Sequence, residues 1–287
     1  MPVVQYRNAA WRKGEAIDRM MSKLIFVNPQ WQGGGDTITY DGAREIESLY
    51  LKQCEFIEVP TSLSTGLQTE YGILGYSAIR QQTALALGLL ERNSCSQIFA
   101  VGGGCDADVP VIAYLNKVYD GKLLVLWFDA HGDLNAPSES QTGLFYGMPA
   151  RILMGDCAWF SDLVERPLTP RQIVQIGGRS FDDAEKRYIK QKGIPHFTHL
   201  SIEKIRTLLD ERPDWYVYIH LDLDVLNPSE FPNTPLPVEG GLSKDDVRGL
   251  LCEIKQNYPF AGLGLYEYSP CGKRDDFLQF IVDLMGT

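Results

Sequence analysis

Two segments of this 287-residue chain carry acidic and histidine side chains at alternating positions. One apolar run leads into Asp129, His131 and Asp133, and a later one leads into Asp222 and Asp224. Side chains at every second position of an extended segment point to the same side. We therefore expect the side chains of each set to lie close together. Carboxylates at such short distances would repel one another unless cations lay between them. The pattern predicts a metal centre.

Acidic residues also follow strands for reasons unrelated to metals, because they cap helices and form turns. One such segment alone would be weak evidence. Both segments here, however, end apolar runs typical of buried parallel strands, and open α/β sheets bind their ligands at the carboxyl ends of such strands. The paired occurrence favours the metal interpretation.

The composition is that of an acidic globular protein, 44% hydrophobic with a formal net charge of −10. It predicts one domain over residues 1–287 and no nucleic-acid partner, since no basic stripe could neutralise phosphates. Net negative charge favours cationic small molecules. The six cysteines are scattered, and no run has the pattern of a membrane span or signal peptide. We therefore expect reduced thiols, a cytoplasmic location and no membrane partner.

Short β-branched and aromatic runs alternate with helical patterns along the chain. Strands are expected at 23–27, 55–59, 97–101, 123–129, 171–176, 194–198, 215–221 and 261–266, and helices at 41–52, 70–92, 107–118, 147–155, 182–191, 201–209, 243–256 and 273–285. Such alternation predicts an α/β fold with a parallel sheet and helices on both faces. Long irregular stretches at 131–146 and 224–242 directly follow the ligand segments, and loops of that length are usually functional.

The ordered motifs resemble those of the arginase (ureohydrolase) family, which includes agmatinases and formiminoglutamases. The motifs are Gly102-Gly103, Asp129-Ala130-His131-Gly132-Asp133-Leu134-Asn135, Asp222-Leu223-Asp224 with Asn227-Pro228, and Glu267-Tyr268-Ser269-Pro270. The resemblance covers almost the whole chain. It implies a three-layer α/β/α sandwich around an eight-stranded parallel sheet, and two divalent ions, manganese in preference. It further implies that Asp129 and Asp222 bridge the two ions, that Asp133 serves one, and that His131 and Asp224 serve the other.

The resemblance also implies roles in catalysis and substrate binding. Glu267 stands where the family holds a guanidinium group, a planar cation whose paired N–H donors match a carboxylate. Asp133 would take a proton from the attacking water and pass it on.

Four further positions are expected to contact the rest of an amino-acid substrate. Asn135 and Thr142 could orient its carboxylate, although Leu144 replaces an amide found in arginases, so this recognition is weakened. Asp182 and Glu185 stand where arginases bind the amino group. They equally suit the first turn of a helix.

Cys105 is the first departure from the family pattern. The family's strand-end motif is Gly-Gly-Asp-His-Ser, and here the stretch is Gly102-Gly103-Gly104-Cys105-Asp106, so a cysteine replaces a histidine ligand. A thiolate can still coordinate, and it favours softer ions, which makes zinc, iron or nickel alternatives to manganese at this position. The alternative is a small buried hydrophobe.

His220 and Tyr146 are the other departures. His220 replaces a small residue and shares a face with Asp222, so it could ligate the weakened metal, act as an acid or base, or merely hydrogen-bond beside the site. Tyr146 stands where arginases carry a proton-shuttling histidine. A phenol with a pKa near ~10 is a poor shuttle at neutral pH, which leaves Tyr146 a hydrogen-bonding role.

These features predict a metal-dependent amidinohydrolase that cleaves a C–N bond of a small cationic guanidino compound. N-hydroxyarginine is one candidate, because its leaving group needs less protonation. The resemblance also leads us to expect a homo-oligomer.

Two alternatives remain. One is a catalytically silent homologue that acts as a regulatory or partner subunit, but so many retained carboxylates argue against it. The other is a zinc deacetylase on the same fold, which requires paired catalytic histidines. The chain's four histidines do not supply such a pair.

Overall fold

The computed structural model describes residues 22–284, and its main feature is one eight-stranded sheet. The strand order is β2-β1-β5-β10-β9-β6-β7-β8, and every neighbouring pair is parallel. The strands are β1 (Lys23–Asn28), β2 (Ile57–Glu58), β5 (Gln97–Gly102), β6 (Leu123–Phe128), β7 (Ile173–Ile176), β8 (His196–Phe197), β9 (Tyr216–Asp222) and β10 (Phe260–Tyr266). This confirms the predicted parallel sheet. Because the strands are parallel, all their carboxyl ends lie along one edge.

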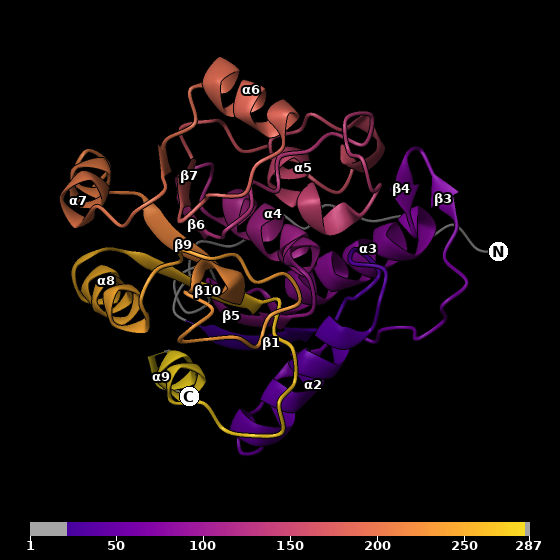
Figure 1. Cartoon of the computed structure of the whole chain (residues 1–287), viewed down its shortest axis with the longest axis horizontal. Coiled ribbons are helices and arrows are strands. Elements are labelled where there is room, and N and C mark those ends of the chain that lie inside the picture. Colours follow the sequence, from indigo (N-terminus) through magenta and orange to yellow (C-terminus); the bar gives the residue numbers. More distant parts are fainter. Residues whose placement is uncertain (1–21, 285–287) are drawn as a thin grey trace.

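Helices cover both faces of the sheet (Figure 1). They are α2 (Ile38–Tyr50), α3 (Tyr76–Asn93), α4 (Val109–Val118), α5 (Pro149–Leu153), α6 (Asp183–Lys192), α7 (Ile202–Asp210), α8 (Lys244–Asn257) and α9 (Asp276–Leu284). Helices α3, α4, α5 and α6 contribute buried side chains to one apolar cluster, and α2, α7, α8 and α9 contribute to the other. The three-layer α/β/α sandwich expected from the motifs is therefore confirmed.

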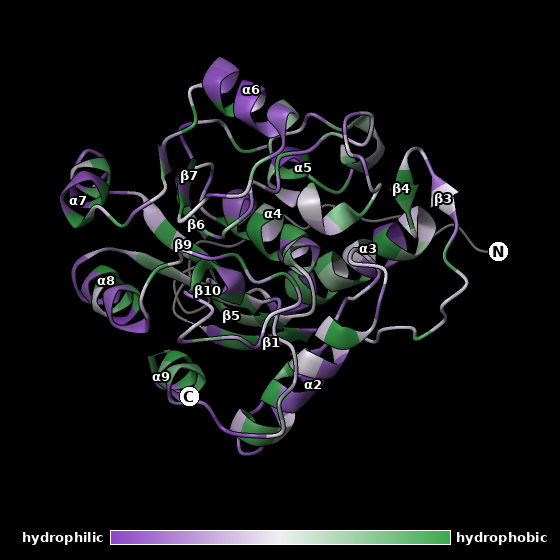
Figure 2. Cartoon of the chain, viewed as in Figure 1, coloured by the Kyte–Doolittle hydropathy of each residue, from purple (hydrophilic) through white to green (hydrophobic). Residues whose placement is uncertain are grey.

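Strand β6 shows how the sequence produces these layers. All six of its residues are buried, so the strand is a continuous apolar run, as buried parallel strands are. Leu123, Val125 and Trp127 belong to one cluster, and the other three residues of the strand belong to the other. Figure 2 shows hydrophobic residues concentrated in the interior and hydrophilic ones on outer surfaces such as that of α6.

The prediction of a helix from residue 70 is wrong at its start. Residues 69–74 form a small antiparallel hairpin of β3 (Thr69–Glu70) and β4 (Ile73–Leu74), and α3 begins only at Tyr76. Tyr71 and Gly72, the two loop residues, have φ values of 52° and 78°. Positive φ at both positions is the requirement of the tightest hairpin turns, and it is incompatible with a right-handed helix.

Two further sequence expectations concern cysteines and membranes. All six cysteines are free. Within residues 22–284, every helix is too short or too polar to traverse a lipid bilayer.

Candidate metal centre

The candidate ligands lie at or just beyond the carboxyl ends of β5, β10, β9 and β6, four adjacent strands in the middle of the sheet. Their donor atoms form three overlapping groups, each within 4.8 Å: Cys105, Asp129, Asp133 and His220; Cys105, Asp222 and Glu267; and Asp129, His131 and Asp224. These groups bring together every residue that the sequence proposes as a ligand, His220 included, and they add Glu267.

His220 and Asp222 alternate along β9 as expected, but Asp129, His131, Asp133 and Asp224 converge through turns beyond the strand ends. Strand β6 ends one residue before Asp129, whose carboxylate accepts the backbone N–H of His131 at 2.6 Å. Asp133 then has a positive φ of 55°. Asp222 closes its strand and accepts the N–H of Asp224 at 2.7 Å, which places Asp224 in a short 3₁₀ turn. Side chain-to-backbone hydrogen bonds of this kind are characteristic of Asp in turns.

Burial and mutual repulsion raise the pKa values of several carboxylates in this cluster. Burial raises the pKa of Asp222 well above its ordinary value, and the charges of Asp224 and Asp129 raise it further. Burial and then Asp129 do the same for the pKa of Asp133. One carboxylate oxygen of Asp133, Oδ2, is buried without a hydrogen-bond partner among the described residues. Such groups must bind protons or cations.

His131 occupies the more accessible side of the cluster, with 27% of its side chain exposed. Its Nδ1 lies 2.8 Å from Asp224 Oδ2 and 3.6 Å from Asp129 Oδ1. Burial alone would lower the pKa of His131, but hydrogen bonds to Asp129 and Asp224 raise it to about 11. The two carboxylates therefore favour a positive charge at this position. Two carboxylates and one imidazole also fit a divalent metal such as manganese.

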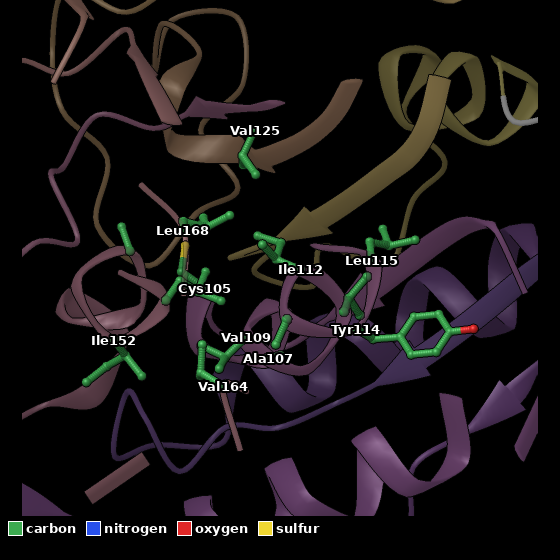
Figure 3. Close-up of a cluster of buried hydrophobic side chains, with 14 of the residues drawn as sticks. Cys105, Ala107, Val109, Ile112, Tyr114, Leu115, Val125, Ile152, Val164 and Leu168 are labelled. Carbon is green, nitrogen blue, oxygen red and sulfur yellow. The ribbon is translucent and has the colours of Figure 1, made fainter. Parts of the chain in front are cut away.

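Cys105 occupies the buried side and is 2% exposed. It begins the 3₁₀ helix η1 (Cys105–Asp108), two residues after the end of β5, and it belongs to an apolar cluster with Ala107 and Val109 (Figure 3). Its Sγ is 3.1 Å from Asp222 Oδ2, 3.9 Å from Asp129 Oδ2 and 3.3 Å from His220 Nε2. The structure therefore places the cysteine among the carboxylates, and His220 beside the cysteine.

Asp108 is a residue of this site that the sequence analysis missed. It is fully buried, and its Oδ2 lies 2.8 Å from Nδ1 of His220. The hydroxyl of Tyr218 donates to its other oxygen at 2.7 Å. In the sequence, Asp108 looks like an ordinary residue at the start of α4. The sequence did contain one indication of such a residue. Tyr218 and His220 place two polar groups on one face of an apolar strand, and buried polar groups need hydrogen-bond partners.

A cleft of about 250 Å³ adjoins the cluster, which reaches it through His131 and Asp133. The cleft is also lined by the four proposed substrate-binding residues and by Tyr146. Burial, followed by the charge of Glu267, raises the pKa of Tyr146 to about 12. None of the described residues that line the cleft is Lys or Arg, so its charged groups are acidic apart from His131.

The substrate-binding candidates also support one another structurally. Glu185 accepts the N–H of Asp182 at 2.8 Å, which caps α6, and the N–H of Leu134 at 3.0 Å, which anchors the loop after Asp133. Asn135 donates its amide N–H to Asp182 Oδ2 at 2.9 Å. The Oδ1 acceptor of Asn135 is left buried without a hydrogen-bond partner within residues 22–284. The fourth candidate, Thr142, is exposed at the rim.

Comparisons with known proteins agree with this architecture. The arginase family model matches residues 38–278. An arginase of Staphylococcus aureus (strain COL) is 33% identical over 198 residues, which is 65% of this chain and 65% of the relative's length. The Entamoeba histolytica arginase structure in complex with L-ornithine has a TM-score of 0.82 at 21% identity and covers 93% of this chain and 99% of its own. The native structure of the Bacillus caldovelox arginase has a TM-score of 0.76 at 24% identity, and the match covers 92% of this chain and 96% of the arginase chain. The two structures show the common fold, and the family match shows that the chain belongs to the arginase family.

Proposed function

We propose that this protein is a metal-dependent amidinohydrolase that cleaves a C–N bond of a small guanidino compound. The observation that carries the proposal is that His131 and Asp133 belong both to the buried ligand cluster and to the wall of the cleft. A substrate in the cleft would thus reach the cluster directly. The acidic lining suits a cationic substrate.

The donor set fits two divalent ions. Asp129 and Asp222 would be shared by both ions. Cys105 and Asp133 would hold the ion on the buried side, and His131 and Asp224 would hold the ion on the accessible side. The oxygen-rich accessible side suits manganese. When bound, such ions supply Lewis-acid polarisation and a water of lowered pKa.

The protein's own groups would position the substrate and move protons. Glu267 is buried beside Cys105, and its carboxylate would pair with the guanidinium N–H donors. Asp133, one of whose oxygens has no hydrogen-bond partner within residues 22–284, would accept the proton of the attacking water and deliver it to the departing amine. Tyr146 has a pKa of about 12, so its phenol would remain protonated near neutral pH and act as a hydrogen-bond donor.

The cleft bears on the choice among guanidino compounds. Asn135 donates an amide N–H to Asp182, and its acceptor oxygen has no hydrogen-bond partner in the part of the chain that the structure describes. An acceptor binds an amino group better than a carboxylate. The site therefore supports a guanidino substrate whose far end carries an amine, and N-hydroxyarginine remains a candidate because its leaving group makes less demand on Tyr146.

Product analysis with a substrate panel tests the proposal. Manganese- and zinc-loaded protein would be incubated with arginine, N-hydroxyarginine and a guanidino amine lacking a carboxylate, and the released amine would be quantified by mass spectrometry. We expect turnover of at least one compound, loss of it in Asp129→Ala, and no change in Asp283→Ala, which removes an exposed aspartate of α9. Protein with two bound ions that releases no amine would instead support the silent-homologue alternative.

A further inference from the structure

His220 is held in a slot built from the neighbouring strands. Its ring is stacked on Trp127 with centroids 3.6 Å apart and faces Tyr266 on the other side at 4.8 Å. A Cβ at Gly264, the residue paired with His220 in β10, would lie 2.4 Å from the Tyr266 hydroxyl. Glycine is therefore required for the ring of Tyr266 to fit. The imidazole is fully buried and cannot turn freely.

Asp108 determines which nitrogen of His220 carries the proton. Its two carboxylate oxygens receive the Tyr218 hydroxyl and the Nδ1 side of the imidazole. An ionised carboxylate only accepts hydrogen bonds, so Nδ1 is the donor in this network. The lone pair of Nε2 then points toward Sγ of Cys105, 3.3 Å away. A carboxylate behind a histidine is the usual arrangement around a metal-binding imidazole.

The distances around Cys105 resemble those between ligands of one ion. Zinc–sulfur bonds of about 2.3 Å and zinc–nitrogen or zinc–oxygen bonds of about 2.0–2.2 Å place two tetrahedral ligand atoms about 3.5 Å apart. The observed separations from Sγ are 3.3 Å to His220, 3.1 Å to Asp222 and 3.9 Å to Asp129. Asp133, 3% exposed, belongs to the same group of donors, and its Oδ2 has no hydrogen-bond partner among the described residues.

We infer that Cys105 and His220 together ligate one ion of the centre, with Asp108 as the carboxylate that orients His220, and that this position selects zinc. Thiolate and imidazole donors favour zinc, whereas the position at His131 and Asp224 keeps a donor set suited to manganese. The centre would then hold two unlike ions. The inference rests on the proposed function only in assuming a two-ion centre, and it does not depend on turnover.

Cobalt(II) titration of the metal-free wild-type protein tests the inference directly, because cobalt reports thiolate ligation through a sulfur-to-metal charge-transfer band. We expect this band to saturate at one cobalt per chain while a second cobalt binds without adding to it. After dialysis against manganese in large excess over zinc, elemental analysis should find one of each. Neither measurement needs a substitution, so misfolding of a variant cannot obscure the result.

Variants assign the ligands. Cys105→Ser should abolish the charge-transfer band, and Cys95→Ser, at a buried cysteine outside the cluster, should leave it unchanged. Asp108→Asn removes the partner that orients His220, so it should lower zinc affinity by about 10–100-fold. His220→Gln removes the ligand itself and should lower zinc affinity at least as much. His196→Gln is the matched control, because that imidazole contacts Gly178 outside the site. Manganese affinity at the second position should change little in all of them.

Each outcome separates this inference from the proposed function. A protein that binds two ions and hydrolyses guanidino compounds without a thiolate band would overturn the inference alone, and Cys105 would then be a buried thiol that donates to His220. An unchanged zinc affinity in folded His220→Gln, checked by thermal unfolding, would also overturn it. A thiolate band in a protein without hydrolysis would uphold the inference and contradict the proposed function.

Discussion

The carboxylate of Glu267 accepts the backbone N–H of Cys105 at 3.1 Å and so joins the end of β10 to the end of β5. In the same turn the N–H of Glu267 donates to Gly103 at 2.9 Å. Glu267 has a φ of 57°, a strained conformation for a residue other than glycine, and such strain persists where surrounding contacts enforce it. The two hydrogen bonds are such contacts, and they hold a buried carboxylate in one position beside the metal ligands.

Glu267→Gln tests whether that carboxylate binds a guanidinium. The amide oxygen can keep the hydrogen bond from Cys105, but the negative charge is lost. We expect kcat/KM to fall by roughly 100-fold, equivalent to about 3 kcal/mol for a charge-assisted pair, while the metal content stays the same. Steady-state kinetics and elemental analysis would measure both, with the exposed Glu203→Gln as control. Full activity in the variant would exclude guanidinium binding at this position.

Asp222 should affect stability in opposite directions with and without metal. Its folded pKa lies well above the ordinary value, so its stabilising effect is present at low pH and is lost as pH rises. At pH 8, Asp222→Asn should therefore raise the Tm of chelator-treated protein. In the presence of manganese it should lower the Tm, because a bridging ligand is missing. Differential scanning calorimetry of both forms would check this, and the same direction of change in both would argue against metal bridging. Hydrolysis should be abolished in Asp222→Ala as in Asp129→Ala.

The sequence predicted the eight strands because buried parallel strands are continuous apolar runs between turn residues. The prediction of a helix was wrong at 69–74, which form a hairpin. The turn there has Tyr71 at positive φ, whereas Asn-Gly or Asp-Gly would have indicated a hairpin turn in the sequence. The sequence proposed the ligands from residue types and order, yet the convergence of most of them depends on turn hydrogen bonds that alternation does not describe. Asp108 could not be found in this way, since its contact with His220 joins residues 112 apart in sequence.

Asp106 should make stability depend on pH between about 4 and 8. Burial raises its pKa from 3.8 to about 7, although a hydrogen bond from Gln30 opposes the shift. A folded pKa above the unfolded value contributes stability that is present below the unfolded pKa and is lost as pH rises through about 7. Three pKa units correspond to at most about 4 kcal/mol. Asp106→Asn should therefore unfold at a higher temperature than wild type at pH 8 and at nearly the same temperature at pH 4. Exposed Asp283→Asn should show no such difference, and parallel pH profiles for wild type and Asp106→Asn would contradict the assignment.

Tyr146 provides the last prediction, which concerns proton transfer. Because burial and Glu267 raise its pKa to about 12, the phenol should not titrate in the range where the enzyme works. Tyr146→Phe should lower kcat by roughly 3–10-fold, the effect of one lost hydrogen bond, without moving the pH optimum. Tyr146→His would instead introduce a group with an ordinary pKa near ~6.5, and the pH–rate profile should gain a new limb in that range. Stopped assays from pH 5 to 9 would distinguish these cases. A complete loss of activity in Tyr146→Phe that Tyr146→His restores would show that the phenol itself transfers the proton, in place of the path through Asp133.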